Sequence, residues 1–169
     1  IVDDGAGGTN RKATMSRLAT YMGTKIGGGM EFIASSGAIS NAASVAFTGF
    51  DSSKYDAYKF IHHYIIPATD NVYFTWNSST DGGSSYDTTS GHYIYGNDGN
   101  SGSVGYGYIS AYNQIGSDTN EFGIIGQSIL YSPHNTSTYK LLKSDVAYFH
   151  TNGQLKQYAM EYGNAYRAA

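Results

Sequence analysis

Cysteine is absent from the 169-residue chain, and only 14% of the residues are charged. Without cysteine, neither disulfides nor a thiolate metal site can hold the fold together. The formal net charge of -3 and the scattered Lys and Arg give no basic stripe for phosphates, which disfavours nucleic-acid binding. No apolar run approaches the roughly 20 residues needed to cross a bilayer, and no secretory signal is visible. We therefore expect no membrane insertion, no nucleic-acid partner and no cofactor.

Tyrosine and glycine are plentiful instead, with 17 and 22 copies. Tyrosine combined with Gly and Ser is typical of strands that bury a ring at one end and expose a hydroxyl at the other, and it is not typical of disorder. The length fits one well-buried domain with at most a small appendage. Because the chain starts at Ile1 and ends without a capping signal, we interpret both ends as cuts in a longer protein.

The first 28 residues predict a strand end, a turn and a short helix. The acidic turn Asp3-Asp4-Gly5 could suggest a calcium loop, but further ligands at regular spacing are lacking. A helix of about two turns follows, ended by Gly23, and its apolar face is the expected oligomer contact: Met15, Leu18 and Met22. So short a helix needs a neighbour, and the glycines at 27–29 predict a hinge. We divide the chain into a connector, residues 1–28, and a domain, residues 29–169.

Beyond the hinge the apolar period changes to two. Residues 58–66 alternate up to Pro67, and residues 72–76 are the expected antiparallel partner. Further strands are expected at 31–35, 44–50, 92–95, 105–112, 122–131, 139–142 and 146–150. Asn152-Gly153 is the strongest two-residue hairpin signal. The predicted fold class is mainly β: an antiparallel, jelly-roll-like β-sandwich preceded by a short strand-turn-helix connector.

No catalytic or metal-binding motif stands out. His62 and His63 are neighbours on a strand and point to opposite faces, so they cannot share a metal ion, and we expect one to be half-buried and the other solvated. The other histidines have no His or carboxylate partner at helical or hairpin register: His92, His134 and His150. A nucleophile elbow and a P-loop are both missing. A pair of catalytic carboxylates stays open, with four residues available: Glu31, Glu121, Asp145 and Glu161.

Residues 79–91 and 96–105 have the lowest apolar content and predict loops at one end of the sandwich. The candidate receptor-binding residues lie in or beside them: Asp81, Tyr86, Asp87, His92, Asn97 and Asp98. Six tyrosines nearby could form a sugar-binding face, although aromatic strand residues more often fill a core: Tyr86, Tyr93, Tyr95, Tyr106, Tyr108 and Tyr112. Trp76 alternates with Val72 and Phe74 and is expected in the core.

Three stretches carry a resemblance to known proteins. The opening DDGAGGTNRKATMSRLATYMG resembles a short module of tail-fibre and other virion structural proteins of tailed phages, particularly phages of marine bacteria. FTGFDSSKYDAYKFIHHYIIPATDNVYFTWNSSTDGGSSYD looks like the domain that commonly follows this module, and YSPHNTSTYK is similar to another recurrent piece of that domain. Such domains usually continue with further strands, so the resemblance implies that the sandwich is incomplete at its C-terminus. It carries no catalytic residues.

The resemblance implies a virion structural protein exposed on a tail fibre or particle surface, forming a homotrimer and contacting other virion proteins. The leading hypothesis is a tail-fibre or tail-spike domain that binds a host surface glycan or protein without catalysis. The alternatives are a tail-associated polysaccharide depolymerase and a capsid or tail decoration protein without a ligand.

Overall fold

The computed structural model describes residues 2–3, 10–11, 14–25, 29–51, 53–97, 100–110 and 114–166. The chain divides into two compact units, Ile1–Gly37 and Ala38–Ala169. This boundary falls later in the chain than the glycine hinge used in the sequence analysis.

The N-terminal unit contains a small hairpin and one helix. Strand β1 (Val2–Asp3) pairs antiparallel with β2 (Asn10–Arg11), and α1 spans Met15–Lys25. The expectation that Gly23 ends the helix is wrong, because α1 continues for two further residues. The side chains of Met15 and Met22 are exposed, whereas that of Leu18 and the residues between β1 and β2 lie outside the described part.

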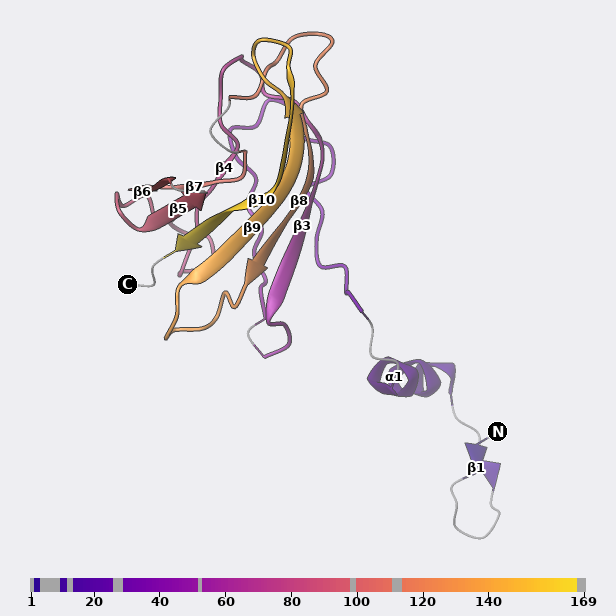
Figure 1. Ribbon diagram of the computed structural model, residues 1–169. Coiled ribbons are helices and arrows are strands. Elements are labelled where there is room, and N and C mark those ends of the chain that lie inside the picture. Colours follow the sequence, from indigo (N-terminus) through magenta and orange to yellow (C-terminus); the bar gives the residue numbers. More distant parts are fainter. Residues whose placement is uncertain are drawn as a thin grey trace. The chain divides into compact units, whose positions relative to one another are not determined.

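The second unit is built on a six-stranded antiparallel sheet in the order β3-β8-β9-β10-β5-β6. Its strands are β3 (Ala57–Ile65), β5 (Tyr93–Asn97), β6 (Asn100–Val104), β8 (Ile124–Tyr131), β9 (Lys140–Phe149) and β10 (Leu155–Tyr166). Figure 1 shows β3, β8, β9 and β10 side by side as the long strands. A separate two-stranded sheet joins β4 (Thr75–Trp76) to β7 (Gly107–Tyr108). The prediction of a mainly β chain with antiparallel sheets is confirmed.

The core lies between one face of the large sheet and the segments that contain β4 and β7. Burial alternates along β9, so that Leu142, Ser144, Val146 and Tyr148 are buried while Lys143, Asp145 and Ala147 are more exposed. Ile109 and Ile115 belong to the same buried cluster. Trp76 is partly buried and packs against this cluster, as its alternating pattern predicts.

Several strand predictions are wrong in detail. The alternating run at 72–76 does not pair with β3, because β3 pairs with β8 and β4 pairs with β7. The ring of Phe74 instead packs edge-on against His62 across the core, with the centroids 5.2 Å apart. Among the described residues 29–51 none belongs to a strand or helix, so the strands expected at 31–35 and 44–50 are not formed. Within the described residues 105–110 of the strand expected at 105–112, only the two residues of β7 form a strand, and residues 111 and 112 lie outside the described part.

Two other stretches are more regular than predicted. The expected loop at 96–105 is largely the antiparallel pairing of β5 with β6, and the two strands expected at 139–142 and 146–150 form one strand, β9. The hairpin predicted at Asn152-Gly153 joins β9 to β10, closed by the Gly153 N–H donating to the His150 carbonyl at 2.7 Å. The turn therefore starts at His150, before the predicted two-residue loop.

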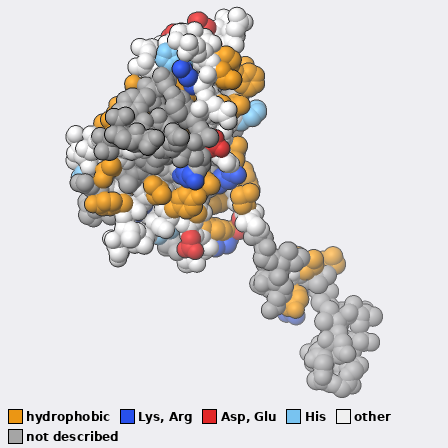
Figure 2. Space-filling view, in the orientation of Figure 1, with side chains coloured by type: hydrophobic (Ala, Val, Ile, Leu, Met, Phe, Trp, Pro, Cys, Tyr) orange, Lys and Arg blue, Asp and Glu red, His pale blue; other side chains and the backbone are white. Residues whose placement is uncertain are grey.

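Charged groups are sparse on the described surface in Figure 2, where uncharged polar and hydrophobic side chains cover most of the area. In the part of the chain that the structure describes, no helix combines the length and apolar character that a membrane span requires.

Candidate functional site

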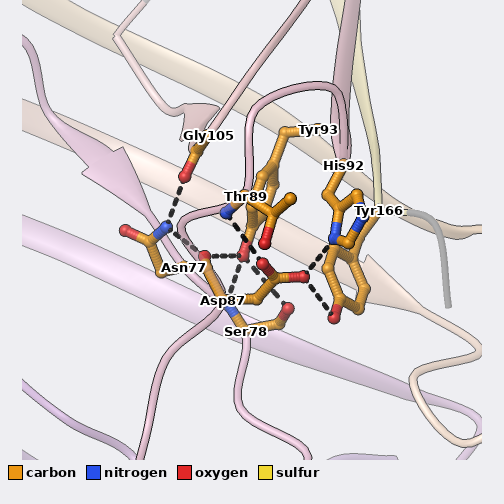
Figure 3. Close-up of polar contacts among 8 residues, drawn as sticks. All are labelled: Asn77, Ser78, Asp87, Thr89, His92, Tyr93, Gly105 and Tyr166. Atoms are coloured by element: carbon orange, nitrogen blue, oxygen red, sulfur yellow. Dashed lines mark hydrogen bonds and ion pairs between the residues drawn. The ribbon is translucent and has the colours of Figure 1, made fainter. Parts of the chain in front are cut away.

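The densest polar arrangement surrounds the carboxylate of Asp87, in the segment between β4 and β5 (Figure 3). One oxygen, Oδ2, accepts hydrogen bonds from His92 Nδ1 at 2.6 Å and from the Tyr166 hydroxyl at 2.9 Å. The other, Oδ1, accepts from the Thr89 N–H at 2.9 Å. An ionised carboxylate only accepts hydrogen bonds, so three donors converge on one negative charge. This contact ties the 87–92 segment to the end of β10.

The backbone of Asp87 is held as firmly as its side chain. Its carbonyl accepts from the Tyr93 hydroxyl at 2.9 Å and from the Asn77 amide at 2.8 Å. The same Asn77 amide nitrogen donates to the Gly105 carbonyl at 2.9 Å, and the Ser78 N–H donates to the Tyr93 hydroxyl at 2.8 Å. We call these eight residues the Asp87 network: Asn77, Ser78, Asp87, Thr89, His92, Tyr93, Gly105 and Tyr166.

The electrostatics of the Asp87 network follow from these contacts. The hydrogen bond from His92 is the main reason why the pKa of the Asp87 carboxyl lies well below its ordinary value, and Thr89 and Tyr166 lower this pKa further. Burial raises the pKa of the Tyr166 hydroxyl, and the adjacent Asp87 carboxylate raises it again. At neutral pH the network therefore contains an ionised carboxylate and a neutral phenol that donates to it.

The Asp87–His92 pair has one feature of a catalytic site, because a carboxylate on Nδ1 orients an imidazole for proton transfer at Nε2. A nucleophilic mechanism also needs a hydroxyl or thiol within reach of that second nitrogen. Among the described residues no such hydrogen bond to His92 is present. As it stands, the pair serves to hold the segment in place, and it offers one partly exposed imidazole to a ligand.

Asp81 forms a second, local arrangement. Its Oδ1 accepts from the Ser79 hydroxyl at 2.7 Å and the Ser85 N–H at 2.9 Å, and its Oδ2 accepts from the Ser85 hydroxyl at 2.6 Å. The two hydrogen bonds from Ser85 are the first causes of a pKa of Asp81 well below its ordinary value. Both carboxylate oxygens are thus engaged by residues of the same loop, so Asp81 fixes the loop's shape.

The structure brings together only part of the predicted receptor-binding set. Asp87 and His92 are in contact, although sequence register gave His92 no carboxylate partner. Tyr86 is 42% exposed in the same loop. Asn97 ends β5, but its side chain lies outside the described residues, as does Asp98 entirely.

One pair of side chains that the sequence did not predict resembles a catalytic base and nucleophile, but this pair is buried. His62 Nε2 lies 2.9 Å from Ser128 Oγ, which lies 2.9 Å from Ser144 Oγ on the next strand. A serine beside an imidazole could be a nucleophile with its base. However, Ser128 is 1% and His62 8% exposed, so a substrate cannot reach them. We assign His62, Ser128 and Ser144 to the core. His63 is exposed on the same strand as His62, which agrees with the prediction that the two histidines point to opposite faces.

Neither metal binding nor a carboxylate pair is supported by the described residues. In the described part of the chain no three His, Asp or Glu side chains are grouped to hold a metal ion. Glu121 is buried and accepts the Asp118 N–H at 2.9 Å, which makes it a loop-stabilising group. Glu31 lies in the N-terminal unit, Asp145 is on β9, and the side chain of Glu161 is outside the described residues.

The sequence gives little signal for the remaining members of the Asp87 network. Tyr166 meets Asp87 across 79 positions of the chain, so no local pattern signals the contact. Asn77 follows a strand-like run and reads as an ordinary turn residue. Tyr93 was considered only as one of six tyrosines, and its ring is fully buried. The only signal in the sequence is the position of Asn77, a polar residue directly after the expected strand at 72–76.

Comparison of the chain with protein-family models, curated proteins and solved structures gives no match.

Proposed function

We propose that the chain is part of a virion structural protein, a tail-fibre or tail-spike domain that binds a host surface receptor, with glycan as the favoured class, and does not transform it. The observation that carries this proposal is the rigid loop at residues 79–92. Asp81 and the Asp87 network fix its backbone, while Tyr86 remains exposed within it. A loop already held in its binding conformation loses little entropy on binding, and tyrosine gives contact area with few rotatable bonds.

The resemblance to tailed-phage proteins supplies the biological setting: a virion, other virion proteins beside the connector, and a homotrimer. Three copies would cover the exposed methionines of α1, which is too short to be stable by itself. In sedimentation velocity we expect a trimer, and a Met22→Glu change should dissociate it. A purely monomeric wild-type chain would contradict this part.

The jelly-roll-like architecture also belongs to the proposal. Its support is the core shared by the large sheet and the β4–β7 segments, which are the two layers a sandwich needs. A jelly roll in the strict sense divides eight strands between two sheets, and the described strands of the second unit divide six to two.

The receptor proposal is tested by binding of the labelled chain to a panel of bacterial envelopes that includes marine bacteria. Tyr86→Ala should abolish most of the binding, because it removes the exposed ring and leaves the loop's hydrogen bonds in place. Tyr139→Ala is the control, since Tyr139 is 55% exposed in a different loop. Wild-type chain that binds none of the envelopes would favour the decoration protein, and unchanged binding by Tyr86→Ala would exclude this loop as the contact.

The second candidate is a polysaccharide depolymerase, which is favoured by the oriented imidazole of His92. Incubation of the chain with purified envelope polysaccharide distinguishes it from a binding protein. New reducing ends that disappear with His92→Gln would establish the enzyme, and an unchanged polymer length supports binding without catalysis.

A further inference from the structure

Four tyrosines gather where β5, β7 and the segment before β4 meet. The ring of Tyr108 is at their centre, with centroid distances of 5.2 Å to Tyr73, 5.3 Å to Tyr95 and 5.2 Å to Tyr106. All three contacts are edge-to-face, with interplanar angles of 68°, 88° and 79°. Tyr73 is 38% and Tyr106 37% exposed, so two of these rings reach the surface. We call these four residues the tyrosine cluster.

The backbone around the tyrosine cluster fits these rings closely. Tyr95 pairs with Gly102 of β6, and a Cβ at that position would collide with the phenol ring and hydroxyl of Tyr95. Only glycine therefore lets this ring lie across the neighbouring strand. The Asn77 amide fixes the Gly105 carbonyl immediately before Tyr106, which connects the cluster to the Asp87 network. The rings are held in place before any ligand arrives.

The chemistry of the tyrosine cluster is neutral and hydroxyl-rich. The hydroxyls of Tyr106 and Tyr108 lie 3.5 Å apart, and the Gln114 amide donates to the Tyr73 hydroxyl at 3.3 Å. Burial, followed by the hydrogen bond with Tyr106, raises the pKa of Tyr108 far above neutral pH, so this phenol remains uncharged. The cluster has no Lys, Arg, Asp or Glu as a member. The four phenols themselves offer an anionic ligand no positive charge.

We propose that the tyrosine cluster is the binding platform for a neutral saccharide, with the exposed rings of Tyr73 and Tyr106 packing against the C–H face of a sugar. Phenol hydroxyls and the Gln114 amide are both donors and acceptors, which matches sugar hydroxyls. The inference rests on the proposed receptor-binding function and deepens it, because it names the ligand class and a second contact region beside the 79–92 loop. Edge-to-face packing around Tyr108 leaves the outer rings fixed as stacking surfaces.

The test is titration of the full chain with cellohexaose, mannohexaose and galactohexaose, followed by calorimetry and by saturation-transfer NMR with irradiation of the tyrosine ring protons. We expect at least one of these neutral hexasaccharides to bind and its C–H protons to receive the transfer. Tyr73→Ala and Tyr106→Ala should each weaken that binding about two- to tenfold. Tyr131→Ala is the matched control, because Tyr131 is also 38% exposed but alternates with buried Leu130 on β8.

Two further probes separate the competing explanations. Hexagalacturonate, the charged counterpart, should bind more weakly than the neutral sugars, and a proline-rich peptide, another ligand class that aromatic surfaces accept, should not bind. Tighter binding of either probe would overturn the saccharide assignment, as would binding to none of the hexasaccharides.

The failure of this inference can be told apart from failure of the receptor function. If the wild-type chain binds hexasaccharides or envelopes and the Tyr73→Ala, Tyr106→Ala double variant binds them equally well, the tyrosine cluster is not the platform but the receptor function stands. If the wild-type chain binds neither envelopes nor sugars, both proposals fall. Circular dichroism of each variant shows whether a loss of binding reflects loss of the fold.

Discussion

Protonation of His62 should destabilise the protein in a defined pH window. This side chain is buried on β3, with Nε2 hydrogen-bonded to Ser128 and its ring edge-on to Phe74. Burial lowers its pKa from 6.5 to about 4. The folded state therefore binds fewer protons than the unfolded state between these two values. His62 contributes its full stabilisation above pH 6.5, and this stabilisation is lost as the pH falls to about 4.

The size of the effect follows from the difference between the two pKa values. At about 1.4 kcal/mol for each pKa unit, the shift corresponds to a loss of about 3 kcal/mol. That is a large share of the roughly 5 to 15 kcal/mol by which domains are stable. The carboxyls of Asp51, Asp81 and Asp87, whose pKa values are lowered from 3.8, lose their contributions below that value and outside this window.

The assay is urea unfolding at a series of pH values between 7.5 and 4, followed by the fluorescence of Trp76. His62→Gln keeps a polar side chain toward Ser128 but cannot be protonated, so its stability should change much less across the series. His63→Gln is the matched control and should retain the full loss, because His63 is exposed on the same strand. Parallel pH profiles for wild type and His62→Gln would refute the reasoning.

Three substitutions test the packing and polar contacts of the second unit through urea unfolding at pH 7 followed by circular dichroism, because Trp76→Ala removes the only tryptophan. Gly107→Ala should cost about 1 to 3 kcal/mol, because the new Cβ would collide with the indole of Trp76. Trp76→Ala should cost roughly 3 to 5 kcal/mol, since the indole packs against the core and edge-on to Tyr93. Asp87→Asn should cost about 1.5 to 3 kcal/mol, a difference that shrinks below pH 3.8, whereas exposed Asp56→Asn should have little effect. An unchanged stability would contradict the predicted collision in Gly107→Ala, and in Trp76→Ala or Asp87→Asn it would contradict the stabilising role of the contacts that are removed.

Local patterns predicted those features of the fold that depend on neighbours in sequence. Opposite orientations of His62 and His63 follow from the two-residue period of a strand, and the β9–β10 hairpin follows from Asn152-Gly153. Strand pairing could not be predicted from local patterns. The alternation at 72–76 indicates a strand-like segment with one apolar face, but it does not indicate against which element that face is buried. In the structure the face packs onto the large sheet, so the segment lies in a different layer from β3.

The candidate site shows the same limit more sharply. Composition identified the 79–91 stretch as a polar loop, with Asp87 in it and His92 directly after it, and it predicted both as receptor-binding residues without partners inside the protein. The two bond to each other, and the partners of Asp87 from outside the loop are Tyr166 at the end of β10 and Asn77, which no spacing rule connects to it. The sequence thus located the loop, whereas the contacts of Asp87 with Tyr166 and Asn77 that hold the loop in shape depend on the tertiary fold.

Because protein donors already engage the carboxylates of Asp81 and Asp87, the expected point of contact with a receptor changes from charged to aromatic groups. A carboxylate whose lone pairs are taken by protein donors must lose those hydrogen bonds before it can accept new ones from a ligand, which costs about as much as the new bonds return. The rings of Tyr86, Tyr73 and Tyr106 carry no such cost, because their exposed surface is still in contact with water. Burial of these rings against a sugar or protein would add apolar contact without breaking the Asp87 network. On this argument Asp81 and Asp87 would position the proposed binding surface, and tyrosine side chains would make it.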